Sequence, residues 1–343
     1  MKKNLLEFTY EQLRESLKNI VDKDYRINQI FEWLYAKKEG DISKWTNLNA
    51  DIRKKIAQDF RARNLTIVKK EESIIDGTIR YTFKTADKKF FFAVLLANKD
   101  KQSVCISCQI GCPMGCNFCS SGRVEFARNL TRGEIVEQVL QIENDTAKKV
   151  SGILFMGMGE PMLNFNNVTA AIKSFISKKE FALGKRHITL STVGNVRAIK
   201  KLAQEDIDIR LALSLHATDD RTRKILIPNN FGFKIDDILS AGEYYLKKSN
   251  SRLTIEFILI ENINNAASDA HKLARLLKKY NLVNPNVQVN IIAFNPIKNT
   301  EFKTPSPESI DKFKMILNLS GIVANIRQPK GVDIGAACGQ LGY

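Results

Sequence analysis

The spacing of hydrophobic residues divides the chain into three regions. Residues 8 to about 62 place hydrophobic side chains at helical intervals, which predicts a group of short helices. Residues from about 65 to 97 are typical of strands, with a hairpin turn at Asp76-Gly77 and a hydrophobic run over Phe90–Ala97. The helical pattern of the first region is carried by Leu13, Leu17, Ile20, Ile27, Ile30, Phe31 and Leu34.

From about residue 100 onward, strands and helices alternate. Thr131-x-x-Glu134 is a capping box that predicts a helix running to about Ala147. Repeated β–α order predicts a parallel sheet with right-handed crossovers, either a barrel or a doubly wound sheet, with functional residues at the carboxyl ends of the strands. Strands are expected at residues 152–156, 187–191, 207–215, 253–260, 287–294 and 322–327, and further helices at 266–280 and 307–319.

These patterns predict a helical N-terminal domain at residues 1–62, a β-rich extension at 63–99 and an α/β core at 100–343. The longest hydrophobic run, Phe90–Ala97, is much shorter than the roughly 20 residues of a membrane-spanning helix. The basic start Met1-Lys2-Lys3 is followed by Asn4 and Glu7, so no signal-peptide core is expected. We therefore expect a cytoplasmic protein with no membrane contact.

The net charge of the chain indicates what kind of partner it binds. It holds 53 Lys and Arg residues against 37 Asp and Glu residues, a net charge of +16. Such a balance suits a polyanionic partner such as RNA, although a solvated basic surface would give the same count. The candidates for phosphate contact are Arg53, Lys54, Arg61, Arg63, Lys69 and Lys70.

Five of the six cysteines lie between residues 105 and 119. Cys112, Cys116 and Cys119 form a Cys-x3-Cys-x2-Cys loop, whose thiolates can bind three corners of a [4Fe–4S] cluster and leave one iron open. A zinc site is the alternative, with Cys105 or Cys108 as the fourth ligand that tetrahedral zinc requires. In a reducing compartment either kind of site is favoured over structural disulfides.

The segment from Cys112 to Cys119, with an aromatic residue before its last cysteine, resembles the signature of radical S-adenosylmethionine (SAM) enzymes. The wider sequence resembles the RlmN/Cfr family of radical SAM RNA methyltransferases, from the N-terminal helices to the last few residues. The motifs that carry this resemblance are Cys105-Ile106-Ser107-Cys108-Gln109-Ile110-Gly111-Cys112, Arg128-Asn129-Leu130-Thr131, Phe155-Met156-Gly157-Met158-Gly159-Glu160-Pro161, Leu190-Ser191-Thr192, Ser214-Leu215-His216 and Ala336-Ala337-Cys338-Gly339-Gln340-Leu341.

The resemblance implies an activity and a fold. It implies methylation of carbon 2 of an adenine in the peptidyl transferase centre of 23S rRNA, and of the adenine next to the anticodon in tRNA. It also implies a radical SAM partial (β/α)6-type barrel, a [4Fe–4S] cluster, two SAM molecules per turnover, and an electron donor such as flavodoxin or ferredoxin. The alternatives are Cfr-like methylation of carbon 8 of the rRNA adenine, or a non-catalytic RNA-binding metal protein.

The Gly159-Glu160 pair follows a predicted strand, where glycine permits close backbone approach and a carboxylate can accept from a ligand ammonium. That pattern alone suits a tight turn equally well. By resemblance, Gly159 and Glu160 contact the amino group of SAM. By the same resemblance, the remaining residues of the SAM pocket are Ser191, Ser214, Leu215, His216 and Asn295.

Two further cysteines have roles implied by the resemblance. Carbon 2 of adenine is electron-poor, so direct methyl displacement from SAM does not suit it. Cys338 would instead take a methyl group from one SAM, and a deoxyadenosyl radical from the second SAM would remove a hydrogen from that methyl group. After the carbon adds to adenine and a proton is lost, Cys105 would attack the sulfur of Cys338 and release the product, leaving a disulfide.

One position departs from the family. The family carries a glutamate thirteen residues before the resolving cysteine, commonly assigned as the proton acceptor, and Phe92 occupies that place here. The nearest acids in the sequence are Asp87 and Asp100. The sequence therefore names no catalytic base.

Overall fold

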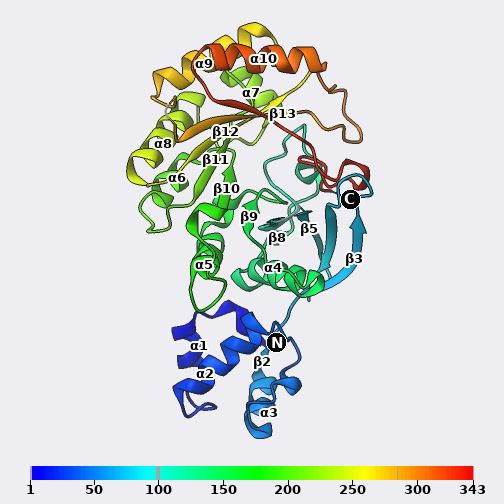
Figure 1. Cartoon of the computed structure of the whole chain (residues 1–343), viewed down its shortest axis with the longest axis vertical. Coiled ribbons are helices and arrows are strands. Elements are labelled where there is room, and N and C mark those ends of the chain that lie inside the picture. Colours follow the sequence, from blue (N-terminus) through cyan, green and yellow to red (C-terminus); the bar gives the residue numbers. More distant parts are fainter. Residues whose placement is uncertain (1, 98–100, 284, 343) are drawn as a thin grey trace.

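A computed structural model describes residues 2–97, 101–283 and 285–342 of the chain. Its N-terminal helices form a group at one end of the molecule, and a large sheet flanked by helices makes up the rest (Figure 1). The C-terminal segment returns to lie beside the strands that follow the N-terminal helices (Figure 1).

The described residues form one ten-stranded sheet, in the order β14-β13-β12-β11-β10-β9-β6-β5-β4-β3. Strands β6 and β9–β14 are parallel to one another, whereas β3, β4 and β5 join them through antiparallel pairs. The bounds of the ten strands are β3 Thr66–Glu72, β4 Ile79–Lys84, β5 Phe90–Ala97, β6 Gln102–Cys105, β9 Gly152–Phe155, β10 Ile188–Thr192, β11 Arg210–Ser214, β12 Leu253–Leu259, β13 Val287–Ala293 and β14 Ala324–Arg327. Two small sheets pair β1 Lys3–Asn4 with β2 Phe60–Arg61, and β7 Gln109–Ile110 with β8 Arg128–Asn129.

Helices follow the parallel strands and lie along the outer side of the sheet (Figure 1). The helix α4 begins after Thr131, whose side chain accepts from the Glu134 amide while Glu134 accepts in return from Thr131, so the predicted capping box is confirmed. The helices are α1 Tyr10–Leu17, α2 Asp24–Phe31, α3 Ala50–Asp59, α4 Arg132–Thr146, α5 Phe165–Ile176, α6 Val196–Leu202, α7 Asp220–Leu226, α8 Ile235–Lys248, α9 Ala267–Lys279 and α10 Pro307–Leu319.

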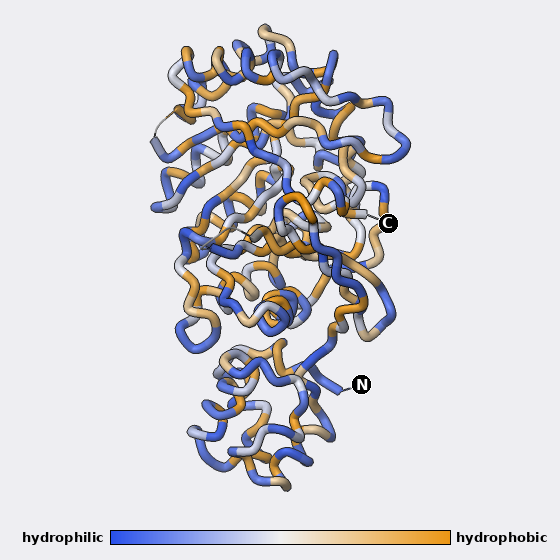
Figure 2. The backbone as a smooth tube through the Cα atoms, turned by 45° about the vertical axis from the view of Figure 1, so that its right-hand side comes forward, coloured by the Kyte–Doolittle hydropathy of each residue, from blue (hydrophilic) through white to orange (hydrophobic). Residues whose placement is uncertain are grey.

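The parallel strands are buried because helices cover them on one side and the barrel interior on the other. Every residue of β12 is buried, which is typical of a strand covered on both faces. Figure 2 shows hydrophobic segments concentrated at the centre of the molecule. The alternation of β4 is different: Ile79, Tyr81 and Phe83 are buried while the residues between them are partly exposed.

The N-terminal helical region packs against the start of α4. The Gly133 amide donates to the Glu7 carboxylate at 3.0 Å, and the buried Arg132 guanidinium donates to the carbonyls of Leu6 and Phe8. Farther along α4, Glu137 accepts from the Asn64 amide. These contacts attach the helical region to the sheet-bearing region through backbone groups.

The predicted barrel-type α/β fold is confirmed, and the boundaries of the three predicted domains remain predictions. All six expected core strands are present, as β9–β14, and the sequence reading missed β6. The strands of the predicted β extension join the same sheet through the pairing of β5 with β6. The hairpin turn at Asp76-Gly77 is present, with Gly77 at a φ of 69°.

Within the described ranges, no helix has the length and the hydrophobic character needed to cross a membrane.

Candidate active site

Cys112, Cys116 and Cys119 lie on a loop at the mouth of the barrel, between β7 and β8, and line one cavity of about 160 Å³. The loop is held in shape by backbone hydrogen bonds, from the Cys119 amide to the Cys116 carbonyl at 3.1 Å and from the Asn117 amide to the Leu226 carbonyl at 3.0 Å. A second hydrophobic cluster surrounds the loop; it contains Met114, Cys116, Phe118, Leu226, Ile227, Ile258, Ile260 and Phe294. The three thiols are therefore presented together on a fixed backbone.

The three thiols fit an iron–sulfur cluster. All three are free, and burial raises the pKa of each, that of Cys112 to about 12. Because burial disfavours the charged thiolate form, these cysteines need a nearby positive charge to lose their protons, and the irons of a cluster supply it. Among the described residues, no group of three or more His, Cys, Asp or Glu side chains is arranged around a single-ion position. A cluster differs from a single ion in that each cysteine binds a separate iron.

Glu160 lies in the same cavity, just beyond β9, and is 3% exposed. Its carboxylate accepts from the Thr192 hydroxyl at 2.6 Å, from the Val193 amide at 2.9 Å and from the Met162 amide at 3.0 Å. Burial raises the pKa of Glu160, and these three donors act against that increase. The carboxylate is thus fixed in place and able to accept from a cationic ligand in the cavity.

Gly159 must be glycine for two reasons. Its φ is +105°, and a Cβ added there would lie 2.5 Å from the Cβ of Gln109. The backbone of this turn can therefore approach both Gln109 and the cavity.

Ser191 is the last residue but one of β10 and Ser214 is the last residue of the neighbouring β11, and their hydroxyl oxygens lie 3.1 Å apart at the cavity wall. His216 follows β11 with a φ of 61°, and its Nδ1 accepts from the Ile258 amide at 3.0 Å. Burial, followed by the nearby Arg223, lowers the pKa of His216 to about 3. The ring is therefore neutral, with its proton on Nε2 as a donor.

Two predicted residues of the SAM pocket lie elsewhere. Leu215 is fully buried in the main hydrophobic core and does not line the cavity, so a ligand contact there would involve its backbone. Asn295 lines an adjoining cavity, and its side-chain amide donates to the Cys338 carbonyl at 2.9 Å. Asn295 therefore positions the loop that carries Cys338.

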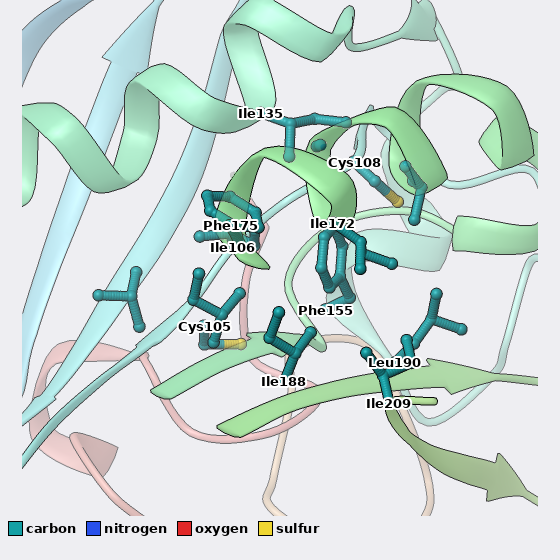
Figure 3. Packing of buried hydrophobic residues seen from close by; sticks show 14 of the residues in the cluster. Cys105, Ile106, Cys108, Ile135, Phe155, Ile172, Phe175, Ile188, Leu190 and Ile209 are labelled. Carbon is teal, nitrogen blue, oxygen red and sulfur yellow. The ribbon is translucent and has the colours of Figure 1, made fainter. Parts of the chain in front are cut away.

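Cys338 lines both the cluster-side cavity and this adjoining cavity of about 100 Å³. Cys105 lines only the adjoining cavity. Figure 3 shows Cys105 at an edge of the packed core, where the C-terminal segment, in faint red, passes beside it. Burial, followed by the proximity of Cys338, raises the pKa of Cys105 to about 12. The two predicted thiols thus share one cavity, although 233 residues separate them in the sequence.

Two charged residues at this junction were missed in the sequence reading. Arg327, at the end of β14, lines both cavities, and its Nη1 lies 3.9 Å from a carboxylate oxygen of Glu256. Glu256 is buried in β12, and its Oε2 has no hydrogen-bond partner among the described residues. The proximity of Cys338 raises the pKa of Arg327. The sequence signal that could have identified this pair is Glu256 itself, a charged residue within the mostly hydrophobic strand β12.

Phe92, at the family's glutamate position, is 5% exposed and lines neither of these two cavities. Its neighbours on the same face of β5, Val94 and Leu96, do line the Cys105 cavity. Glu160 and Glu256 are the acids found along the walls of the two cavities within the described part of the chain.

Most of the basic residues proposed for phosphate contact make internal contacts instead. Lys69 pairs with Glu71 at 2.9 Å, and Lys70 pairs with Asp145 at 2.7 Å. Arg53 and Arg63 donate to the backbone carbonyls of Ser43 and Lys38. Their roles in RNA contact remain predictions.

Comparisons with known proteins agree with this geometry. A family model described as the ribosomal RNA large subunit methyltransferase N-terminal domain matches residues 3–62, and the radical SAM superfamily matches residues 106–277. A probable dual-specificity RNA methyltransferase RlmN of Endomicrobium trichonymphae is 60% identical, covering 100% of this chain and 98% of that protein. The protein of the same name from Thermotoga petrophila is 43% identical, over 99% of this chain and 97% of that protein. A crystal structure of a radical SAM methyltransferase from Sphaerobacter thermophilus has a TM-score of 0.93 and 36% identity, over 99% of both chains.

Proposed function

This chain belongs to the RlmN family of radical SAM methyltransferases, and on that premise we propose that it methylates carbon 2 of an adenine in 23S rRNA and in tRNA. The observation that carries the proposal is the position of Cys338. This thiol lines the cavity that holds the three loop cysteines and also the cavity that holds Cys105. A carbon attached to Cys338 can therefore meet SAM on one side and the RNA base on the other.

Different residues of the cluster-side cavity would bind the cluster and SAM. Cys112, Cys116 and Cys119 would hold a [4Fe–4S] cluster, and Glu160 would accept from the amino group of SAM. When bound, the cluster supplies the electron that cleaves SAM and generates a deoxyadenosyl radical. The buried walls of this cavity exclude water from so reactive a species.

The residues of the adjoining cavity handle the carbon and the product. Cys338 would accept the methyl group from one SAM and present it for loss of a hydrogen atom. After the carbon has joined adenine, the adduct would have to lose one electron, which a bound cluster can accept, and the proton of carbon 2. Cys105 would then attack the Cys338 sulfur, so that an S–S bond forms as the S–C bond breaks, and the released carbon would keep the electron pair and take up a proton to become the methyl group. Arg327 lines the same cavity as both thiols, so its positive charge can favour a thiolate at either one.

The partners follow from the chemistry. The substrates are RNA, and each turnover requires an external electron donor of the flavodoxin or ferredoxin kind together with a reductant for the disulfide. Such donors, and the reducing conditions that preserve six free thiols, favour a cytoplasmic site of action.

The test begins with anaerobic reconstitution of the protein with iron and sulfide. We expect a brown protein that cleaves SAM when reduced, and a methyl group on Cys338 detectable by mass spectrometry of its peptide. Reduced enzyme should then convert adenine to 2-methyladenine in 23S rRNA and tRNA transcripts. Appearance of 8-methyladenine would contradict the carbon 2 assignment, and a colourless zinc protein would contradict the radical mechanism.

Two variants separate the roles of the thiols. Cys338→Ala should abolish methylation while SAM cleavage persists. Cys105→Ala should retain methylation of Cys338 but accumulate a covalent protein–RNA adduct, since no thiol is left to attack the Cys338 sulfur. Cys108→Ala is a matched control in the same segment, because Cys108 lines neither cavity.

A further inference from the structure

A large groove of about 1160 Å³ opens beside the barrel mouth and contains none of the residues assigned above to catalysis. Three segments that are distant in the sequence form its walls: residues 88–90 at the tip of the β4–β5 hairpin, residues 123–127, and residues 296–299. The groove is about seven times larger than the cluster-side cavity, so it is far too wide for SAM alone.

The groove is strongly basic. Arg80, Lys88, Lys89, Arg123 and Lys298 line it, against the single acid Glu125 among its described lining residues. Arg80 is paired with Glu71 at 2.7 Å. For the other four cations, no ion pair with an acid occurs in the described ranges. Their charge is therefore available to an anionic partner, in contrast to the paired Lys69 and Lys70.

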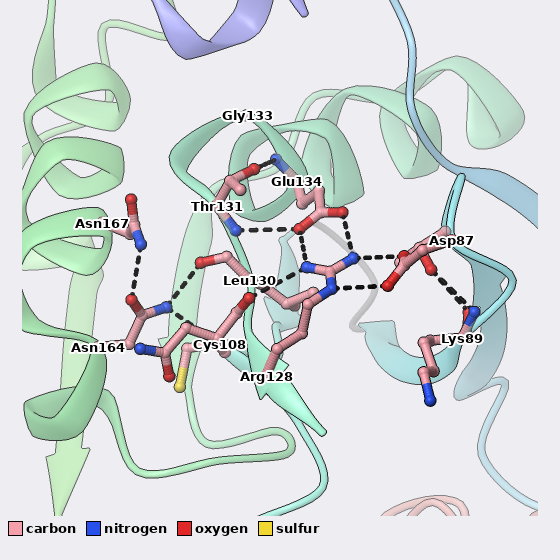
Figure 4. Close-up of polar contacts among 12 residues, drawn as sticks. Asp87, Lys89, Cys108, Arg128, Leu130, Thr131, Gly133, Glu134, Asn164 and Asn167 are labelled. Carbon is pink, nitrogen blue, oxygen red and sulfur yellow. Dashed lines mark hydrogen bonds and ion pairs between the residues drawn. The ribbon is translucent and has the colours of Figure 1, made fainter. Parts of the chain in front are cut away.

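The cations of the hairpin tip are held on a fixed support. Lys88 has a φ of 62°, which turns the chain sharply at the tip. The preceding Asp87 forms a two-pronged ion pair with Arg128 at 2.7 and 2.9 Å, and Arg128 in turn pairs with Glu134 at the start of α4. Figure 4 shows the Lys89 side chain pointing away from this network. The opposite wall is joined to Arg123, whose guanidinium donates to the carbonyls of Lys298 and Asn299.

Two exposed aromatic side chains accompany these cations. Phe126 is 40% exposed and Phe90 is 38% exposed, and both line the groove. Cations that follow a phosphate backbone, combined with aromatic rings on which bases stack, are typical of surfaces for unpaired nucleic acid. A groove for double-stranded RNA would need only the cations and the shape.

The groove is also continuous with the Cys338 loop. The Ser120 amide donates to the Gly339 carbonyl at 2.7 Å, and the Gln340 side-chain amide donates to the Pro296 carbonyl at 3.0 Å. Ser120 and Gln340 line the groove, whereas their neighbours Cys119 and Gly339 line the catalytic cavities. A strand of RNA in this groove would therefore contact residues that directly adjoin the walls of the cavities lined by Cys338.

We propose that this groove binds the unpaired RNA segment next to the target adenine, with Lys88, Lys89 and Lys298 on phosphates and Phe126 stacked on a base. This assignment rests on the proposed function for the identity of the RNA. It explains how a base removed from its stack reaches the buried thiols, because the neighbouring nucleotides are held at the entrance.

The experiment measures RNA binding to the reconstituted protein by fluorescence anisotropy, using a stem-loop RNA with an unpaired loop and a fully paired duplex of equal length. Lys88→Ala/Lys89→Ala should lower the slope of log affinity against log salt by about 1.4, or about 0.7 for each lost phosphate contact. The control Lys248→Ala/Lys278→Ala removes the same charge from exposed positions on α8 and α9 and should leave the slope unchanged.

The aromatic contact is tested separately. Phe126→Ala should weaken stem-loop binding by about 5- to 150-fold and leave duplex binding unchanged, whereas Phe126→Trp should retain both. Equal salt slopes for the two lysine pairs, or an equal loss of stem-loop and duplex binding in Phe126→Ala, would overturn the assignment. Methylation is measured on the same samples. A wild-type protein that binds through the groove but never methylates RNA would contradict the proposed function and not the groove.

Discussion

The neutral state of His216 provides a direct test of how this site is built. The ring is 5% exposed, and its Nδ1 accepts from the Ile258 amide, so protonation would place a charge in a buried site and break that hydrogen bond. The pKa of His216 is about 3 in the folded protein, against an ordinary value of 6.5. The folded state therefore binds fewer protons than the unfolded chain below pH 6.5.

The sign and size of the effect follow from proton linkage. Stability from this depressed pKa is fully present above pH 6.5 and is lost as the pH falls towards 3. At pH 5 the histidine is protonated in the unfolded chain but not in the folded protein. This pH is about 1.5 units below the ordinary pKa of 6.5, where the loss of stability begins. At about 1.4 kcal/mol per unit, the loss between pH 8 and pH 5 is about 2 kcal/mol.

Urea unfolding of the apoprotein at pH 8 and pH 5 measures this loss, with His216→Asn as the comparison. Asparagine tolerates the φ of 61° at this position and offers an oxygen to the Ile258 amide, but it does not titrate. The wild type should lose about 2 kcal/mol more than the variant between the two pH values. Equal losses would refute the reasoning, as would an imidazole NMR signal, identified by its absence in the variant, that titrates between pH 5 and 8.

Three further outcomes are expected from single sites. Glu160→Gln should weaken SAM binding about 10- to 100-fold in equilibrium dialysis, because a charge-assisted hydrogen bond is lost, while the cluster absorbance is unchanged. Arg327→Met should lower the free energy of unfolding by about 3 kcal/mol at pH 8, because the Glu256 carboxylate is left buried without a cation, and adding Glu256→Gln should recover part of the loss. Thr131→Ala should cost about 1 kcal/mol by removing the N-cap of α4, whereas Thr131→Ser should not, as thermal or urea unfolding can show.

Much of the fold could be predicted because its signals are local. The capping box of α4 and the largely hydrophobic sequence of β12 each depend on a few consecutive residues, and both elements lie where the sequence placed them. Strand β6 was missed because it is only four residues long and two of these residues are polar. It is a strand because it pairs with β5 and β9. Pairing between distant segments has no local signal.

The same distinction applies to the candidate site. The Cys112–Cys119 loop is recognisable because its three candidate ligands are close in the sequence. The side chain of Leu215 could not be placed in the core from a motif, since its neighbours Ser214 and His216 both face the cavity. Arg327 and Glu256 gain their significance from one another and from Cys338, across β12, β14 and the C-terminal loop. Such a relationship between residues distant in the sequence can be recognised only in the folded structure.

The C-terminal loop resolves a geometric problem in the proposed relay. A carrier that serves two partners could swing on a flexible loop, yet this loop is fastened by the Asn295 side chain on the Cys338 carbonyl and by Ser120 on the Gly339 carbonyl. Gly339, at a φ of +85°, permits that close contact, since a Cβ there would lie 3.0 Å from the Phe118 carbonyl oxygen. Because Cys338 already lines both cavities, we expect that rotation of its side chain can turn its sulfur towards either one. In the proposed relay, the fixed backbone would keep the carbon within reach of both SAM and the base, which a mobile loop would not.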